Sequence, residues 1–328
     1  MKVSIITPCY NDGRFLDEAV RSVEAQTFAD WELLIVDDGS TDPETQRILQ
    51  DWNRPKTRLL RVPHGGVTAA RNFAIQEAAG EYLTFFDCDD RLHPQFLEKT
   101  VGRLEAEPRL AFVSFYVHLH GDEAWDWKPE RCDLVTLLGD CSVATAAVVR
   151  RAAVLEVGGF DRAMELGHED WDLWLSLVER GHPGAIIPEI LFHYRRRPRS
   201  RSTIADHGAT YLELFRDRVR KHQASYQKHL FELLWQKEQD IQSYLDGLDA
   251  ARANFESSLA PAVVRRREEL KTLRRAALDA MERRLDEAYR QLDDTRAALD
   301  HEQSTPALRL PGPLRDAFEW ARRRKEEK

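Results

Sequence analysis

Cysteine is scarce in this chain. Its 328 residues include 4 cysteines, with no CxxC pair among them, and no histidine stands at zinc-finger spacing. Neither a disulfide framework nor a structural zinc site is therefore indicated. We expect reduced and mostly buried thiols.

Long hydrophobic runs are also lacking. No window reaches the roughly 18 apolar residues of a membrane-spanning helix. The N-terminus begins with a strand-like run at residues 3–7 and has neither the basic flank nor the apolar stretch of a signal peptide. We expect a cytoplasmic protein, with peripheral contact at the inner membrane face as an open alternative.

Positive charge is in deficit over the first part of the chain. Residues 1–200 carry 23 Lys and Arg against 33 Asp and Glu, whereas residues 201–328 carry 25 against 23. An acidic first part argues against duplex nucleic-acid binding, which rests on neutralising phosphates, and suits a site for a divalent cation. The length, at roughly 150 residues per domain, predicts one large domain plus an extension, or two domains.

Short β-branched runs alternate with helical periodicity from residue 2 to about residue 200. This alternation is typical of βαβ units around a mainly parallel sheet, so it predicts an α/β domain. The predicted strands are 3–7, 32–37, 58–62, 81–86 and 110–117. The predicted helices are 14–25, 42–52, 67–78 and 94–107.

The composition changes after about residue 203. Glycine and strand-like runs almost disappear, and residues 204–304 show apolar side chains three and four apart. A heptad-like stripe of this kind predicts a coiled coil and hence a homo-oligomer, or an internal antiparallel helical hairpin, with a break at Pro261. Residues 305–328 predict a Pro-rich break and a short basic amphipathic helix over 314–324, which could reach a membrane surface. The stripe consists of Leu270, Leu273, Ala277, Met281, Leu285, Ala288, Leu292 and Leu299.

Polar clusters follow the first two predicted strands. Residues 7–12 follow the first strand, and residues 36–42, with the sequence VDDGSTD, follow the second. In open α/β sheets ligands collect at the carboxyl ends of strands. The carboxylate of Asp38 could accept a hydrogen bond from a base or a ribose hydroxyl, whereas Asp38 and Asp42 could also be helix caps.

The strongest local signal for a binding site is the run Asp87-Cys88-Asp89-Asp90, which places three carboxylates within four residues. It directly follows five uncharged residues, 82–86, of a predicted strand. Carboxylate oxygens are the ligands of Mg²⁺ and Mn²⁺, whose coordination is often completed by substrate phosphates. The alternative is a capping cluster before the next helix.

Taken together, these motifs resemble the inverting glycosyltransferases of family 2 with a GT-A fold, in which a nucleotide-binding half carries a DxD motif. The resemblance covers about residues 2–203 and implies a Rossmann-like GT-A domain over 1–203. Its remaining motifs are Ala70-Arg71-Asn72, Gly80-Glu81-Tyr82, Gly158-Gly159-Phe160-Asp161 and the run Glu169-Asp170-Trp171-Asp172-Leu173-Trp174.

The resemblance also implies roles for single residues. Asp170 would be the general base that deprotonates the acceptor hydroxyl, with Glu169 orienting the acceptor; without the family, both acids could be dipole partners at a helix start. Asp89 would ligate Mn²⁺ or Mg²⁺ on the donor diphosphate. The implied donor-binding residues are Pro8, Tyr10, Asn11, Asp38, Arg71 and Asp87.

The basic segment at 192–202 closes the predicted domain. Family members commonly have Tyr-Arg-x-His here, and this chain has Arg197 where the histidine would stand, with His193 four residues earlier. Arg195 and Arg197 are therefore expected to bind the donor diphosphate, and which of Arg197 and His193 replaces the family histidine stays open. The alternative is a basic surface loop that faces a membrane or RNA.

The sequence thus predicts a metal-dependent inverting glycosyltransferase. Its donor would be a nucleotide-diphosphate sugar, with UDP-sugars as the default, and its acceptor a glycan, a lipid-linked glycan or a protein. Trp125 and Trp127 could border the acceptor cleft or cover a core edge.

Two alternative functions are an inactive scaffold that assembles through its coiled coil and a sugar-1-phosphate nucleotidyltransferase. The second would need a Gly-rich basic loop after the first strand, where residues 7–12 stand instead.

Overall fold

The computed structural model describes residues 1–122, 124–164, 166–197, 208–255 and 262–303. Two units can be distinguished, residues 1–242 and 243–328. Within the described ranges, no helix is long and apolar enough to cross a membrane.

A nine-stranded sheet forms the centre of the first unit, in the order β3-β2-β1-β4-β8-β6-β9-β5, with β7 paired to β6. Its first four strands are parallel and comprise β1 (Val3–Cys9), β2 (Trp31–Asp37), β3 (Thr57–Arg61) and β4 (Tyr82–Phe85). Every residue of β2 and β4 is buried, because helices cover both faces of a parallel sheet. These four strands and the long strand β6 confirm the predicted strands.

The second half of the sheet is mixed. It contains β5 (Arg91–Leu92), β6 (Phe112–Gly121), β7 (Trp125–Trp127), β8 (Val148–Arg150) and β9 (Gly184–Arg196). β8 runs antiparallel to both β4 and β6, whereas β6 and β9 are parallel.

The sequence did not predict four of these strands. β5, β7 and β8 are only two or three residues long and carry no periodicity. β9 contains Pro188, and its register with β6 shifts between Phe115 and Val117, so that Ile187 and Ile190 pair while Pro188 is passed over. A bulge of this kind tolerates the missing N–H of proline, which sequence patterns cannot foresee.

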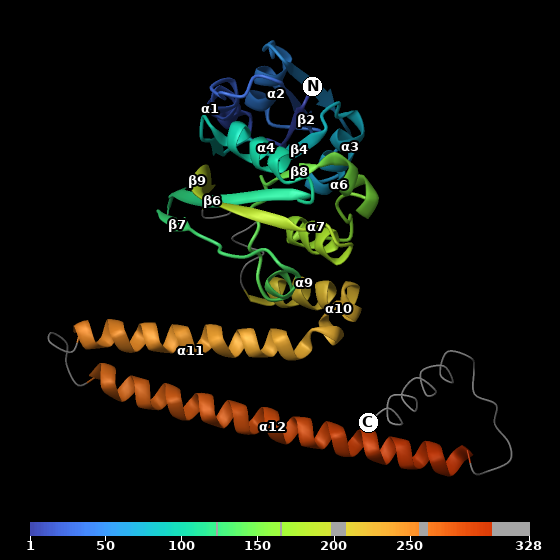
Figure 1. Ribbon diagram of the computed structural model, residues 1–328, viewed down its shortest axis with the longest axis vertical. Helices are drawn as coiled ribbons and strands as arrows, with labels where there is room; N and C mark the ends of the chain where they lie inside the picture. The colour runs from blue at the N-terminus through green and yellow to red at the C-terminus, as the bar shows by residue number, and fades with distance from the viewer. Residues whose placement is uncertain (123, 165, 198–207, 256–261, 304–328) are drawn as a thin grey trace. The chain divides into compact units, whose positions relative to one another are not determined.

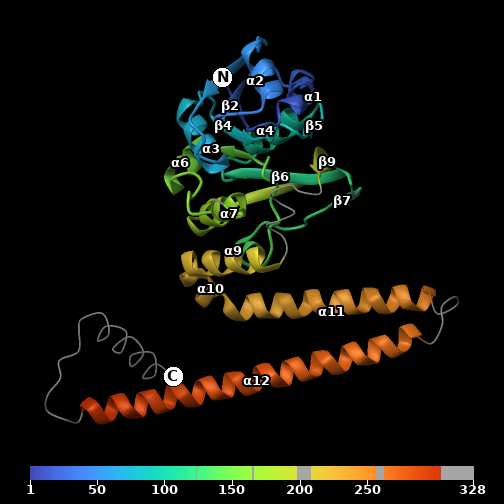
Figure 2. The ribbon, with the colours of Figure 1, turned by 180° about the vertical axis from the view of Figure 1, so that it is seen from behind.

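Helices cover both faces of the sheet, as Figures 1 and 2 show. On one face, α1 (Gly13–Glu24), α2 (Pro43–Gln50) and α4 (Phe96–Ala106) bury Val20, Leu49 and Phe96 in a first core. The other face carries α3 (Val67–Glu77), α5 (Leu134–Gly139), α6 (Arg151–Val157) and α7 (Glu169–Glu179), which contribute to a second core. The predicted helices are confirmed, and Asp42 caps α2 by accepting a hydrogen bond from the Thr45 N–H at 2.8 Å.

The described residues after 203 are helical, as predicted. It comprises α9 (Gly208–Lys221), α10 (Gln223–Lys228), α11 (Leu230–Phe255) and α12 (Ala262–Gln303). The first unit reaches Gln242 and so includes α9, α10 and the first half of α11. The predicted domain boundary at 203 stays a prediction. The predicted break at Pro261, the Pro-rich segment and the helix at 314–324 lie outside the described residues.

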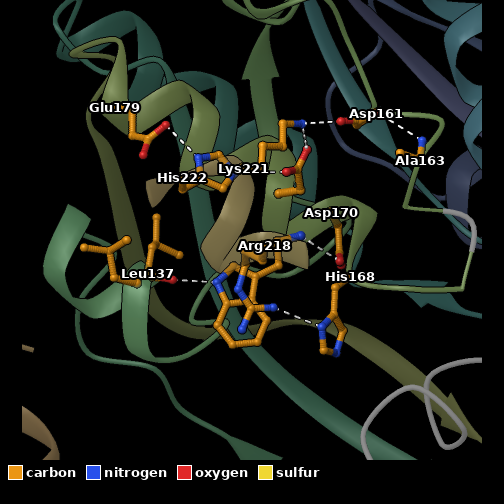
Figure 3. Close-up of polar contacts among 12 residues, drawn as sticks. Leu137, Asp161, Ala163, His168, Asp170, Glu179, Arg218, Lys221 and His222 are labelled. Carbon is orange, nitrogen blue, oxygen red and sulfur yellow. Dashed lines mark hydrogen bonds and ion pairs between the residues drawn. The ribbon is translucent and has the colours of Figure 1, made fainter. Parts of the chain in front are cut away.

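α9 and α10 are joined to α7 through a buried ionic network (Figure 3). His222 contacts Asp172 Oδ1 through Nε2 at 3.0 Å and Glu179 Oε2 through Nδ1 at 2.7 Å. Lys221 Nζ donates to Asp172 Oδ2 at 2.8 Å and to Asp161 Oδ2 at 2.6 Å. Burial alone lowers the pKa of His222, but its hydrogen bonds to Asp172 and Glu179 outweigh burial and raise it.

Arg218 completes the same interface. It is fully buried, and its guanidinium carbon lies 3.3 Å from the centre of the Trp171 ring. Nη1 of Arg218 contacts Nδ1 of His168 at 3.0 Å, and because a guanidinium can only donate, Nδ1 is the acceptor. Helix α9 thereby contacts His168, directly before α7, and Trp171 in its first turn.

The raised pKa of His222 makes stability depend on pH. Since the folded-state pKa lies above the usual value of 6.5, the protonated ring stabilises the fold below that value, and this contribution is lost as the pH rises through the folded-state pKa. We expect His222→Gln to lower the free energy of unfolding by about 1.5 to 3 kcal/mol at pH 6. At pH 9 the loss should be smaller.

Urea denaturation followed by circular dichroism at both pH values measures this difference. His182→Gln is the matched control, because His182 forms a 2.9 Å pair with Glu156 in which the glutamate is half exposed. An equal loss for His222→Gln at pH 6 and pH 9 would contradict the prediction.

Candidate active site

The loops after β1 and β2 are tied together by Asn11. Its backbone has a φ of 57°, in the left-handed region that asparagine tolerates better than most residues. Oδ1 of Asn11 accepts hydrogen bonds from the N–H groups of Thr41 at 2.7 Å and Asp42 at 2.8 Å. Pro8 lies within β1 and pairs with Val36 of β2. Two residues predicted to bind the donor, Pro8 and Asn11, therefore sit where the two strands end.

Tyr10 and Asp38 are linked through His64. The rings of Tyr10 and His64 stack with centroids 4.1 Å apart, and Nδ1 of His64 lies 2.9 Å from the Asp38 carboxylate. The same buried carboxylate accepts hydrogen bonds from the N–H groups of Gly65 at 2.8 Å and Gly66 at 3.0 Å. Asp38 thus fixes the loop that leads into α3. The residues next to His64 in the sequence give no indication of this stack.

The three aspartates after β4 each contact a different arginine. Asp87 Oδ1 accepts from Arg71 at 2.7 Å, and Asp89 Oδ2 pairs with Arg197 at 2.8 Å. Asp90 Oδ1 accepts from the backbone N–H of Arg195 at 2.8 Å. Arg71 and Arg197 thus place positive charge against Asp87 and Asp89, whereas the contact of Arg195 with Asp90 is made by the backbone.

Burial governs the charge state of this cluster. It raises the pKa of Asp89 to about 6, and the charge of Asp87 adds to the shift. Burial also raises the pKa of Asp90, with the charge of Asp89 as the next cause. A cation placed beside these carboxylates would stabilise their charged form and so lower their pKa values.

Arg197 bridges two loops. Its Nη1 and Nη2 donate to the two carboxylate oxygens of Asp12 at 2.9 and 3.0 Å, and Nη2 also reaches Asp89. Arg195 instead donates from Nε to the backbone oxygen of Asp89 at 2.8 Å and from Nη2 to Glu18 at 2.6 Å. The ring of His193 lies 5.7 Å from that of His118. The structure therefore places Arg197, rather than His193, in contact with the carboxylate of the predicted metal ligand.

Arg71 connects the aspartate loop with the start of α7. Its side chain is 1% exposed, and Nη1 donates to Glu169 Oε1 at 2.7 Å while Nη2 donates to Asp87. Burial lowers the pKa of Arg71, but the charges of Asp87 and Glu169 outweigh this and raise it. The guanidinium is therefore a permanent charge between two carboxylates that lie 82 positions apart in the sequence, 87 and 169.

Asp170 is held by two donors at the first turn of α7. The hydroxyl of Thr145 donates to Oδ2, and the backbone N–H of Trp171 donates to Oδ1 at 2.8 Å. Burial raises the pKa of Asp170, and the charge of Glu169 adds to the effect. The preceding residues, Gly167 and His168, have φ angles of 138° and 58°, so the chain turns sharply into the helix. The sequence did not point to Thr145, which lies in a loop without a recognisable motif.

A cavity of about 270 Å³ brings the two halves of the site together. Asp87 and Asp90 line it from the aspartate loop, and Thr145 and Asp170 line it from the other side. Trp125 and Trp127 of β7 form part of its wall. The predicted base Asp170 and one predicted donor-binding residue, Asp87, therefore share one cavity, and both tryptophans border it.

The carboxylates of the aspartate loop, residues 87–90, suit a divalent cation that is shared with a substrate. Within the described residues, no three Asp, Glu, His or Cys side chains converge into a group that could hold a metal ion alone. Mg²⁺ and Mn²⁺ are, however, commonly held by one or two carboxylates together with substrate phosphates. Asp89, with Asp87 nearby, offers that kind of donor set.

Comparison with known proteins links these features to one family. The sequence profile of "Glycosyl transferase family 2" matches residues 4–153. A putative teichuronic acid biosynthesis glycosyltransferase of Bacillus subtilis is 30% identical over 200 residues, which cover 59% of this chain and 78% of that protein. The Escherichia coli enzyme named UDP-Glc:alpha-D-GlcNAc-diphosphoundecaprenol beta-1,3-glucosyltransferase is 29% identical over 188 residues, covering 56% and 72%.

Two further relatives, from Sinorhizobium fredii and Myxococcus xanthus, are much longer, and this chain spans less than a quarter of each. Among solved structures, S. aureus TarS 1–349 in complex with UDP-GlcNAc superposes with a TM-score of 0.54 at 18% identity, over 62% of this chain and 61% of that one. At this identity the likeness concerns the fold, which matches the predicted class.

Proposed function

Because this chain belongs to glycosyl transferase family 2 and is a glycosyltransferase with a GT-A fold, we propose that it moves a sugar from a nucleotide-diphosphate donor to a hydroxyl group with inversion. The observation that supports this most is the bridge through Arg71, which joins the aspartate loop to Glu169 beside Asp170. Asp87 on the donor side and the candidate base Asp170 both line one cavity.

The donor is proposed to be a UDP-sugar, bound at the ends of β1 and β2. Tyr10 and the residues fixed by Asn11 and Asp38 offer an aromatic face and hydrogen-bonding groups for a base and a ribose. The E. coli relative is named for a UDP-sugar, which supports the choice of nucleotide.

The diphosphate is proposed to lie against the aspartate loop. Asp89 would hold a Mn²⁺ or Mg²⁺ ion, which supplies positive charge to the leaving diphosphate. Arg197 is poised beside Asp89, and its planar fork suits phosphate oxygens. Arg195 is proposed to contribute indirectly, since its contacts with Asp89 and Asp90 hold the loop in place.

Asp170 is proposed to be the general base. Its carboxylate is fixed by Thr145 and by the backbone of Trp171, and its raised pKa brings it closer to the pH at which a base works best. The acceptor hydroxyl would lose its proton to Asp170 as its oxygen attacks the anomeric carbon, and the bond to the diphosphate would break on the opposite face. Glu169, held by Arg71, adds negative charge that favours proton uptake by Asp170.

The acceptor is proposed to be a glycan of a bacterial surface polysaccharide. The B. subtilis and E. coli relatives are named for teichuronic acid biosynthesis and for a lipid-linked sugar acceptor, respectively. Lipid-linked glycans and proteins remain alternatives within the same reaction, because the cavity wall formed by Trp125 and Trp127 suits a sugar in any of these contexts.

The chain is also proposed to form a homo-oligomer through α12. Leu270, Leu273 and Met281 belong to the predicted apolar stripe, and each is more than half exposed in the single chain. Burial of a large apolar side chain contributes roughly 1.5 to 3 kcal/mol, so a partner helix would gain considerable free energy from covering them.

We expect Asp89→Ala to abolish metal-dependent donor binding while the fold stays intact. The carboxylate lies at a loop and contributes little apolar packing, and Arg197 keeps its pair with Asp12. Calorimetry of UDP-sugar binding with and without Mn²⁺ measures the effect. Asp51→Ala, at the exposed end of α2, is the matched control. Unchanged affinity and unchanged metal dependence in Asp89→Ala would refute the metal assignment.

Asp170→Asn should lower turnover by about 10² to 10⁴, the usual contribution of a general base, and leave donor affinity unchanged. Steady-state kinetics and UDP-sugar titration separate the two quantities. Asp172→Asn is the matched control on the same helix, because Asp172 contacts Lys221 and His222, so it should lower stability more than turnover. Loss of donor binding in Asp170→Asn, with turnover retained, would assign Asp170 a structural role.

Multi-angle light scattering tests the oligomer. We expect the full chain at micromolar concentration to have the mass of an oligomer, and a chain without residues 262–328 to have the mass of a monomer, because the deletion removes the stripe of α12. A monomeric full chain with an unchanged state after the deletion would refute the oligomer.

A further inference from the structure

A second and larger hollow lies next to the reaction cavity. This groove, which we call the distal groove, has a volume of about 700 Å³ and is lined by residues between 127 and 142 and by the first turns of α11, between 231 and 240. Trp127 lines both the distal groove and the cavity that contains Asp170. The two hollows are therefore neighbours that share one side chain as a wall.

The wall formed by α11 is firmly attached to the α/β domain. Leu233 packs against the second core, and Gly139 at the end of α5 is approached so closely by α11 that an added Cβ would lie 2.9 Å from Cε of Lys237. Arg131 Nη2 also donates a hydrogen bond to Gln236 Oε1 at 3.2 Å. These contacts belong to the first unit, and they give the groove a fixed shape.

Aromatic side chains on this wall remain exposed. Phe231 is 76% exposed and Trp235 is 59% exposed, and both line the groove together with Trp127. Gln236 and Gln239 stand beside them and can donate and accept hydrogen bonds. Aromatic faces beside amides and carboxylates match the chemistry of a sugar, which has apolar C–H faces and a rim of hydroxyl groups.

The net negative charge of the residues that line the groove disfavours anionic ligands. Its two cations are already paired, Lys128 with Asp126 at 3.0 Å and Arg131 with Asp133 at 3.2 Å. A polymer that carries carboxylates or phosphates would meet net negative charge here, which is unfavourable. The acidic residues that line the groove are Glu130, Asp133, Asp140, Glu232 and Asp240.

We propose that the distal groove binds the uncharged sugar units of the acceptor chain, beyond the unit whose hydroxyl reacts at Asp170. The inference rests on the proposed function, because it assumes that the adjacent cavity receives an acceptor. Under this proposal the enzyme prefers acceptors that contain several uncharged sugars in a row, because one of these sugars stacks on Trp235. Helix α11, which lies outside the family match at 4–153, would then contribute to substrate selection.

The test uses the full chain on an array of immobilised oligosaccharides. The probes are neutral gluco- and N-acetylglucosamine oligomers of one to six units, with uronate-containing oligomers of the same lengths. We expect binding to neutral oligomers that strengthens with length and exceeds binding to the uronate series. Trp235→Ala should weaken it about tenfold, which corresponds to about 1.4 kcal/mol. Tyr244→Ala, a 69% exposed aromatic on the same helix that does not line the groove, should leave it unchanged.

Several results would overturn the proposal. These are binding that Trp235→Ala leaves unchanged, a preference for the uronate series, or no binding to any neutral oligomer. A change of oligomeric mass in Trp235→Ala by light scattering, without a change in oligosaccharide binding, would assign the groove to a contact between copies of the chain. UDP-sugar titration of Trp235→Ala and of the wild type distinguishes the two proposals. If only the groove proposal is wrong, the UDP-sugar still binds. If the wild type does not bind a UDP-sugar, the proposed function is refuted.

Discussion

The buried guanidinium of Arg71 is the contact on which the organisation of the site depends. It is 1% exposed and donates to Asp87 on one side and Glu169 on the other, both at 2.7 Å. Removing one member of such a buried pair typically costs about 3 to 5 kcal/mol, because the remaining charge is left without compensation. The aspartate loop and the start of α7 can therefore approach each other only with Arg71 between them.

Arginine side chains of this kind allow several carboxylates to lie close together in and around one cavity. Asp87, Asp89 and Asp90 follow a buried strand, and burial raises the pKa of the last two. Arg71 of α3 and Arg197, which directly follows β9, place positive charge against Asp87 and Asp89. A fixed arrangement of opposite charges in a partly closed site is what transfer of a sugar from a diphosphate requires, since negative charge on the leaving group must be stabilised without rearrangement of solvent.

The helices after the α/β domain take part in the same architecture. α9 places Arg218 against Trp171 and His168. Lys221 at its end and His222 directly after it contact Asp172, so the first turn of α7 is held by these residues (Figure 3). The first turns of α11 are attached at Gly139 and Arg131. The part of the chain that supports α7 thus extends well past the segment matched by the family.

Periodicity within short segments was sufficient to predict the α/β class, the first four parallel strands, the helices between them and the helical character of the region after 203. The run of aspartates and the resemblance to the family also predicted Asp87, Asp89 and Asp170 as site residues, and their roles stay predictions. Other features could be recognised only in the folded chain. Arg71 joins Asp87 to Glu169, and Thr145 donates a hydrogen bond to Asp170. Arg197 contacts Asp12 and Asp89, and β9 lies between β6 and β5. Each of these depends on residues brought together by the order of strands in the sheet, and that order is set by packing across the whole domain, which no short stretch of sequence records.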